Sequence, residues 1–80
     1  MNVVLEFNKS VSEDVLNYNF HPTQKTKILD NGNIEVKFNS GGKLAICFEL
    51  FKWGANVQIK KPIKLKEYYA DYMQHILDNI

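Results

Sequence analysis

The chain has 80 residues and a net charge of +1, so it forms one small domain without a global field that attracts nucleic acid or membranes. All ten basic residues are lysines, which removes the bidentate arginine fork used to grip phosphates and guanine edges. The single cysteine excludes an internal disulfide, and no stretch reads as a signal peptide or membrane span, so we expect a cytoplasmic protein.

The first elements along the chain are a strand and a short helix. Residues 1–7 alternate apolar and polar side chains, which predicts a strand with one buried face. Ser10 and Glu13 then have the spacing of a capping box at a helix start. This helix is expected to end before Pro22, because proline disfavours helical backbone in the residue that precedes it.

A β-hairpin is predicted around Asn31 and Gly32, since Asn-Gly is the strongest short-range hairpin signal. A three-residue loop would pair Ile28 with Val36 and direct the lysines of the incoming strand outward. A shift by one residue would bury those lysines, so we expect the three-residue loop, with a glycine bulge at Gly32.

The second half of the chain predicts helix, strand and helix. Residues 43–53 form an apolar helix that Gly54 ends as a left-handed cap, and a strand follows over residues 56–60. Pro62 opens a last helix whose apolar stripe continues to the final residue. The order β-α-β-β-α-β-α predicts an α+β fold: a ferredoxin-like two-layer sandwich with sheet order 4-1-3-2 and an extra C-terminal helix.

The middle helix carries more apolar side chains than one sheet can cover. Its predicted core stripe, at helical spacing, consists of Leu44, Cys47, Phe48 and Phe51. A second apolar edge beside that stripe consists of Ile46, Leu50 and Trp53. We expect this edge, together with Tyr72 and Ile76 of the last helix, to form the interface of a homodimer.

Residues able to carry chemistry are few and scattered. His21, Cys47 and His75 fall on three separate elements, so neither a metal site nor another cofactor is expected. Cys47 lies on the predicted core stripe, where a cysteine behaves as a small hydrophobe. Without a nucleophile beside a base, the sequence predicts no enzyme activity.

Two charged surfaces remain open to alternative interpretations. A candidate ligand or anion site consists of His21, Gln24, Lys60 and Lys61, close to the lysine-rich start of the last helix. The open face of the sheet is expected to show Glu6, Lys25, Lys27, Glu35, Lys37, Gln58 and Lys60. That face is either a solvated, salt-bridged surface or a docking surface for phosphate or an acidic neighbour.

Four short motifs occur in a characteristic order over nearly the whole chain. They are His21-Pro22-Thr23-Gln24, Asn31-Gly32, Trp53-Gly54 and Pro62-x-x-Leu65-Lys66. In their order and spacing the chain resembles the C-terminal extension (WCX) domain of WYL-domain-containing (DeoR-like) transcriptional regulators, although Lys66 stands where that family has arginine. The helix-turn-helix and the WYL barrel of such regulators are not within residues 1–80.

This resemblance implies a regulatory and oligomerisation module of a bacterial transcriptional regulator. Such a module would form a homodimer, relay the effector state from the WYL barrel to the helix-turn-helix, and contact DNA only through those parts of its parent. The alternative function is an ACT-like sensing domain that binds a small nucleotide or another anion.

Overall fold

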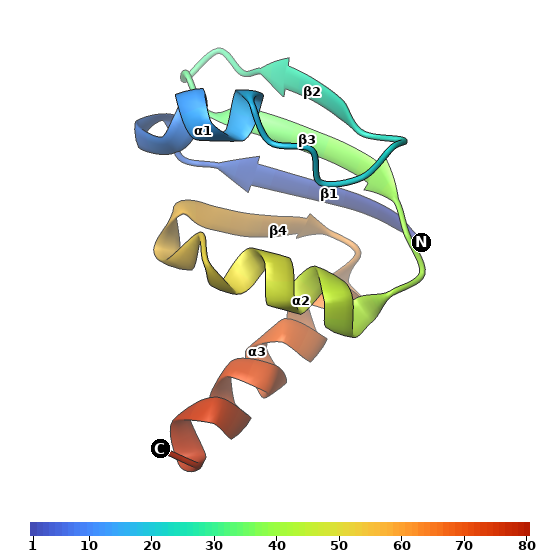
Figure 1. The fold of residues 1–80 in the computed structure, drawn as a ribbon, viewed down its shortest axis with the longest axis vertical. Coiled ribbons are helices and arrows are strands. Elements are labelled where there is room, and N and C mark those ends of the chain that lie inside the picture. The colour runs from blue at the N-terminus through green and yellow to red at the C-terminus, as the bar shows by residue number, and fades with distance from the viewer.

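A four-stranded antiparallel sheet with helices on one face forms the body of the molecule in the computed structural model, which describes residues 1–80 (Figure 1). The strands are β1 (Asn2–Phe7), β2 (Lys25–Ile28), β3 (Ile34–Asn39) and β4 (Val57–Lys61). The helices are α1 (Ser12–Leu16), α2 (Lys43–Phe51) and α3 (Ile63–Asp78), with 3-10 turns at Lys9–Val11 and Gly54–Asn56. The predicted α+β class is confirmed.

β1 is central in the sheet, whose order is β2-β3-β1-β4. It pairs antiparallel with β3 on one side and with β4 on the other, while β2 pairs only with β3. From the β4 edge the strands are therefore β4, β1, β3 and β2. Both β2 and β4 are edge strands, each with one row of backbone groups that no neighbouring strand of the sheet pairs.

The core lies between one face of this sheet and the helices. Alternate residues of β1 and β3 point into it because side chains on a strand alternate between the two faces. The sheet contributes Val3, Leu5, Phe7, Ile34, Val36, Phe38 and Ile59. The helices contribute Val15, Ile46, Cys47, Leu50 and Leu65. No polar or charged side chain is buried among them.

Helix α2 packs through a different face from the one predicted. Ile46 and Leu50 are buried, at 6% and 1% exposure, beside the fully buried Cys47. Phe48, by contrast, is 71% exposed, and Leu44 is also exposed. The prediction that Ile46 and Leu50 form an exposed edge is therefore wrong. Apolar residues surround most of this helix, so its periodicity did not determine which side would meet the sheet.

The start of the first helical segment also differs from the prediction. The Asn8 side chain, not Ser10, caps it, because its Oδ1 accepts the Ser10 backbone N–H at 2.9 Å. Ser10 lies inside the 3-10 turn, and its hydroxyl is 3.5 Å from Oδ1 of Asn56. No capping box with Glu13 forms, since α1 begins at Ser12 without a side-chain cap.

The β2–β3 hairpin has the predicted three-residue loop and the predicted glycine conformation. Gly32 has a φ of +87°, and the Leu29 N–H donates to the Asn33 carbonyl at 2.8 Å. The pairing differs by two residues from the prediction, because Ile28 lies opposite Ile34. A shift by two residues keeps every side chain on its expected face, so the lysines of β2 still point away from the helices.

Helix α3 leaves the body after its first turns and projects beyond it (Figure 1). Pro62 is its N-cap, and Leu65 is its only buried residue. Tyr69 and Tyr72 pack on the rim of the core, whereas the last turns carry exposed apolar side chains. Neither α3 nor any other helix has the length and apolar character needed to cross a membrane.

The two glycines with left-handed backbone provide a test of the fold. Gly54 has a φ of +56° with no atom near the position of an added Cβ, so Gly54→Ala adds backbone strain without a clash. We expect this substitution to lower the free energy of unfolding by about 1 kcal/mol. Gly41→Ala is the matched control, because Gly41 has equal space and no positive φ. Urea unfolding measures both, and equal stabilities of the two variants would contradict the assignment.

Candidate functional site

The four residues predicted as an anion site are not brought together. His21 and Gln24 lie in the loop before β2, whereas Lys60 and Lys61 lie in β4 at the opposite edge of the sheet. His21 stacks on Phe38 of β3, and Gln24 forms its hydrogen bonds within its own loop and to Thr26 at the start of β2. The loop itself reaches the lysines through Thr23, which lines one surface depression with Lys61, whereas His21 and Gln24 are not among its lining residues.

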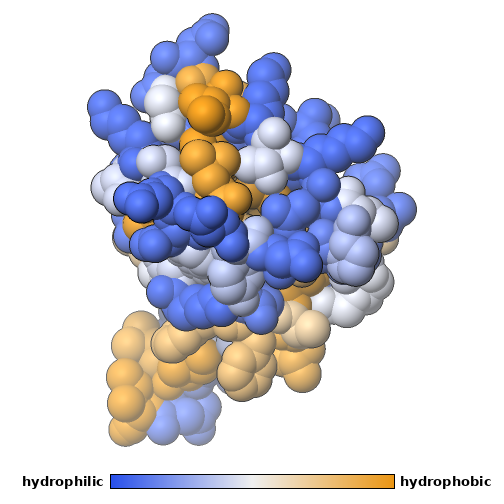
Figure 2. Space-filling model, turned by 45° about the horizontal axis from the view of Figure 1, so that its top comes forward, coloured by the Kyte–Doolittle hydropathy of each residue, from blue (hydrophilic) through white to orange (hydrophobic).

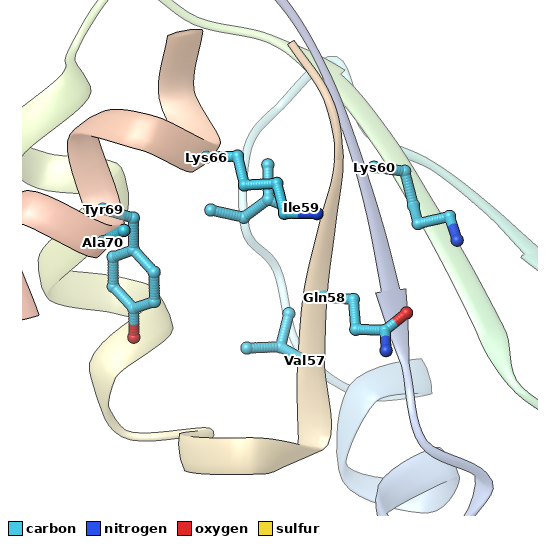
Figure 3. Close-up of a pocket in the computed structure, with 7 residues that line it drawn as sticks. All are labelled: Val57, Gln58, Ile59, Lys60, Lys66, Tyr69 and Ala70. Atoms are coloured by element: carbon cyan, nitrogen blue, oxygen red, sulfur yellow. The ribbon is translucent and has the colours of Figure 1, made fainter. Parts of the chain in front are cut away.

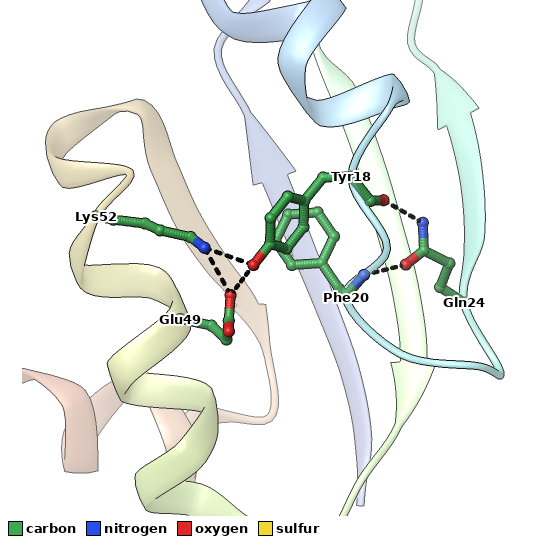
Figure 4. Close-up of polar contacts among 5 residues, drawn as sticks. All are labelled: Tyr18, Phe20, Gln24, Glu49 and Lys52. Carbon is green, nitrogen blue, oxygen red and sulfur yellow. Dashed lines mark hydrogen bonds and ion pairs between the residues drawn. The ribbon is translucent and has the colours of Figure 1, made fainter.

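Gln24 instead holds the loop that precedes β2 (Figure 4). Its side-chain oxygen accepts the backbone N–H groups of Phe20 at 2.5 Å and of His21 at 3.2 Å. Its amide nitrogen donates to the Tyr18 carbonyl at 3.1 Å. One side chain thus satisfies three backbone groups that no strand or helix could pair. These contacts occupy both ends of the Gln24 amide within its own loop.

The His21 side chain also stabilises the loop before β2, through contacts with Thr23 and Phe38. Its Nδ1 accepts the Thr23 backbone N–H at 3.2 Å and lies 2.9 Å from the Thr23 hydroxyl. Its ring stacks on Phe38 with centroids 5.8 Å apart and planes 12° apart. Since Nδ1 accepts a hydrogen bond from an amide, the neutral ring carries its proton on Nε2. His21 and Gln24 therefore serve the folding of the segment in which the motif occurs.

The two lysines of the predicted site have different surroundings. Lys60 lies 3.8 Å from a carboxylate oxygen of Glu6, across the open face of the sheet. Lys61 has no ion-pair partner and lines a separate surface depression with residues of the other three strands and of the loop before β2. Only Lys61 therefore remains free to meet a ligand.

A polar clamp that the sequence did not reveal joins α2 to the loop after α1 (Figure 4). The Tyr18 hydroxyl donates to Glu49, and the Lys52 ammonium donates to the Tyr18 oxygen at 2.5 Å. Lys52 also lies 3.1 Å from Glu49 and 4.2 Å from the centroid of the Tyr18 ring. Glu49 and Lys52 have the spacing of a helix-surface pair, but Tyr18 comes from 31 residues away and carries no local signal.

The clamp shifts the pKa of Glu49 below its usual value. The Tyr18 hydrogen bond is the main cause, and Lys52 adds to it against the opposing effect of desolvation. The pKa of Lys52 is raised by its own hydrogen bond to the Tyr18 oxygen and by its contact with Glu49. Because Glu49 is paired and hydrogen-bonded as a carboxylate, its role is to hold α2 and not to exchange protons near neutral pH.

Beneath the clamp, Trp53 packs in an aromatic cluster. Its ring meets Phe7 edge-on with centroids 5.2 Å apart, and it also contacts Tyr18 and Phe20 at 5.6 and 5.7 Å. Such aromatic pairs each contribute about 0.5–1.5 kcal/mol beyond the burial of their area. Trp53, which was predicted at an interface, is therefore engaged within its own chain and fixes the end of α2 on the sheet.

A hollow of about 530 Å³ lies between β4 and α3 (Figure 3). Val57, Ile59 and Tyr69 line its apolar side, and Lys66 extends over it from α3 (Figure 3). Its lining contains no carboxylate, thiol or imidazole. The hollow is an open groove along β4, and its titratable groups are Lys60, Lys66 and Tyr69.

The thiol of Cys47 is enclosed in the core, and burial raises its pKa. A buried protonated thiol is a poor nucleophile and a poor metal ligand. No three His, Cys, Asp or Glu side chains lie close enough together to hold a metal ion.

Exposed large apolar side chains are concentrated on α2 and α3, which pack against each other. They include Leu44, Phe48 and Phe51 on α2, Tyr68, Ile76 and Leu77 on α3, and the terminal Ile80. Figure 2 shows hydrophobic atoms over the lower part of the molecule, where α3 lies. Single exposed apolar residues are common, but several large ones concentrated on two adjoining helices are typical of an interaction surface. We refer to these seven residues as the helical apolar surface.

The Glu49 clamp predicts a pH-dependent contribution to stability. With a lowered pKa in the folded state, this carboxylate stabilises the fold above its unfolded pKa, and the effect is lost as the pH falls through the folded value. Glu49→Gln should lower the free energy of unfolding by roughly 0.5 kcal/mol at pH 7 and make no difference near pH 2.

Urea unfolding between pH 7 and pH 2 measures this effect. The control is Glu67→Gln, which removes a carboxylate that forms no ion pair. An unchanged difference between wild type and Glu49→Gln at all pH values would contradict the clamp.

The buried thiol gives a second prediction. Cys47 should react with a disulfide reagent such as 5,5′-dithiobis(2-nitrobenzoate) only at the rate of global unfolding, because it has no exposed surface in the folded state. Absorbance of the released thiolate in increasing urea follows the reaction. Rapid stoichiometric reaction of the native protein would show that Cys47 is accessible.

Comparison with known proteins adds no relative to this description. No protein-family model matches the chain. No curated protein matches it with significant similarity. The assignment of function therefore depends on the residues, their geometry and the motifs described above.

Proposed function

We propose that this domain is a regulatory and oligomerisation module that pairs with a second copy through the helical apolar surface. The observation that carries the proposal is the exposure of Phe48, at 71%, within a group of seven large apolar side chains. An interface of standard size buries about 800 Å² per partner, about one-seventh of the 5565 Å² surface of this chain. The phenylalanines of α2 are the natural anchors of such an interface, because buried aromatic residues supply most of the binding energy.

The charge distribution on α3 favours a second copy of the chain as the partner. Lys64 and Lys66 lie in its first turns, and Asp71 and Asp78 lie in its second half. Two α3 helices that pack antiparallel about a two-fold axis place the basic half of each beside the acidic half of the other. The same patch then serves both copies, which is the requirement of a closed symmetric dimer.

Within this proposal the fold is a ferredoxin-like two-layer sandwich with α3 added at its C-terminal end. The strand neighbours support it, as does the placement of the core between one sheet face and the helices. The parent protein would be a WYL-type bacterial transcriptional regulator in the cytoplasm. Its helix-turn-helix would contact DNA, and this module would relay the effector state to it.

The motifs behind the resemblance support this reading through their structural roles. His21 and Gln24 close the loop before β2, and Gly32 and Gly54 supply the two left-handed residues. Pro62 opens α3, the helix proposed to pair. Motif residues that close loops and form turns specify a fold. Such motifs are compatible with a regulatory module that catalyses no reaction.

Self-association is tested by changing the helical apolar surface without altering the core. The wild-type chain should dimerise at micromolar concentrations, and Phe48→Glu should weaken the dimer at least tenfold by burying an unpaired charge at its centre. Ile28→Glu is the matched control, since Ile28 is 62% exposed but lies on β2, away from α2 and α3. Sedimentation velocity over a range of concentrations measures both.

Two results would contradict the proposed function. One is a wild-type chain that stays monomeric at millimolar concentration, and the other is equal weakening by Ile28→Glu. The link to a regulator has its own test, since the parent gene should encode a helix-turn-helix and a WYL barrel together with this domain.

A further inference from the structure

A row of lysines crosses the open face of the sheet, on the side away from the helices. The strand registers place Lys25 opposite Lys37, Lys37 opposite Val4, and Val4 opposite Lys61. These four residues, one from each strand, therefore form a continuous line across the sheet. Neighbouring strands are about 4.8 Å apart, so the backbone positions of the outer lysines are separated by about 14 Å.

Lys61 belongs to this row because of a β-bulge in β4. Leu5 lies opposite Ile59 but Val4 lies opposite Lys61, so Lys60 is an extra residue in the pairing. With regular alternation Lys61 would share the core-facing side of Ile59. The bulge turns it to the open face, which is a recognised use of bulges to redirect a side chain.

The row concentrates positive charge that the protein neutralises only at Lys37. Two lysines directly opposite each other on antiparallel strands repel, and Lys25 and Lys37 are such a pair. Glu35 lies 3.5 Å from Lys37, but Lys25 and Lys61 have no ion pair. The next row of the face contains Lys27 beside Glu35 and Glu6, which lie opposite each other. The lysine row itself contains no carboxylate, although the chain as a whole carries only +1.

The three lysines line a surface depression of about 430 Å³ that contains no acidic residue. Its other polar groups are the side chains of Asn2, Thr23 and Asn39. The Asn39 side-chain oxygen accepts a hydrogen bond from the Met1 ammonium group at 3.1 Å, so its NH₂ group is not used in that contact. The three lysines, Asn2 and Asn39 project from the strands, whereas Thr23 lies in the loop before β2 and its hydroxyl is hydrogen-bonded to His21 and to the Asn39 backbone N–H.

We propose that this depression binds a small anion that carries several phosphate groups, of the kind found in a nucleotide polyphosphate. Three flexible ammonium groups on a line match a chain of phosphates, whereas a single planar carboxylate would engage only one of them. Binding also relieves the repulsion between Lys25 and Lys37. The site lies on the opposite face from the helical apolar surface, so the proposal does not depend on dimerisation.

The surrounding surface favours a compact ligand over a nucleic-acid strand. A phosphate backbone that continued along the strands would meet Glu35 and Glu6 in the next row. Proteins that bind single strands stack bases on exposed aromatic rings, but Phe7 and Phe38 point into the core. The lysine row therefore fits a few phosphates and not a long strand.

Isothermal titration calorimetry with inorganic tripolyphosphate tests the proposal. The wild-type protein should bind it at low ionic strength and more weakly at 200 mM salt, because contacts between lysine and phosphate are screened. Lys25→Gln and Lys61→Gln should each weaken binding about 3- to 10-fold. Lys27→Gln is the matched control, because Lys27 is on the same strand and face but lies opposite Glu35 in the next row. It should change affinity less than twofold.

The melting temperature is a second measurement, and it shows whether a variant that fails to bind is still folded. Tripolyphosphate should raise the melting temperature of the wild-type protein, and Lys25→Gln alone should melt no lower than wild type because it removes a like-charge pair. The proposal is overturned by the absence of binding at 10 mM tripolyphosphate in low salt, or by equal losses in Lys27→Gln and Lys25→Gln. It is also overturned if a twelve-residue oligothymidylate binds more tightly than tripolyphosphate.

Discussion

The rest of the structure depends on the pairing of β1 with a neighbour on each side. Val3, Leu5 and Phe7 are its inward side chains, and all three are completely buried. Burying one such side chain contributes about 1.5–3 kcal/mol, which is a large share of the stability of a small domain. Every other layer is positioned relative to this strand: β3 and β4 through hydrogen bonds, and the helices through the apolar side chains that they bury on it.

The register of β1 also divides the molecule into two chemically different sides. Residues opposite its inward side chains join the core, and residues opposite Val4 and Glu6 reach the open face. The helical side is left with an excess of apolar surface, and the open side with an excess of lysines. Because a sheet separates the two, the proposed assembly surface and the proposed phosphate site can be occupied independently. The bulge at Lys60 in β4, opposite the step from Val4 to Leu5, breaks the alternation and adds Lys61 to the charged side.

Two long-range contacts then fix the elements that have little core of their own. The Gln24 side chain closes the loop before β2, and the clamp of Tyr18, Glu49 and Lys52 attaches the end of α2 to the segment after α1. The short α1 contributes only Val15 to the core, so it depends on such connections. The clamp and Trp53 orient α2 on the sheet, and in this orientation Phe48 faces outward.

The sequence by itself determined the strands, their faces and the residues with left-handed backbone. Alternation over β1 and β3, the Asn-Gly turn, Gly54 and the start of α3 at Pro62 are local signals, since each depends on neighbours a few residues away. Only the tertiary structure decided which side of α2 is buried, because apolar residues around most of a helix are equivalent until it packs. The same holds for the partners of Gln24 and for the face of Lys61. Those depend on contacts and strand registers between distant segments, which no local pattern encodes.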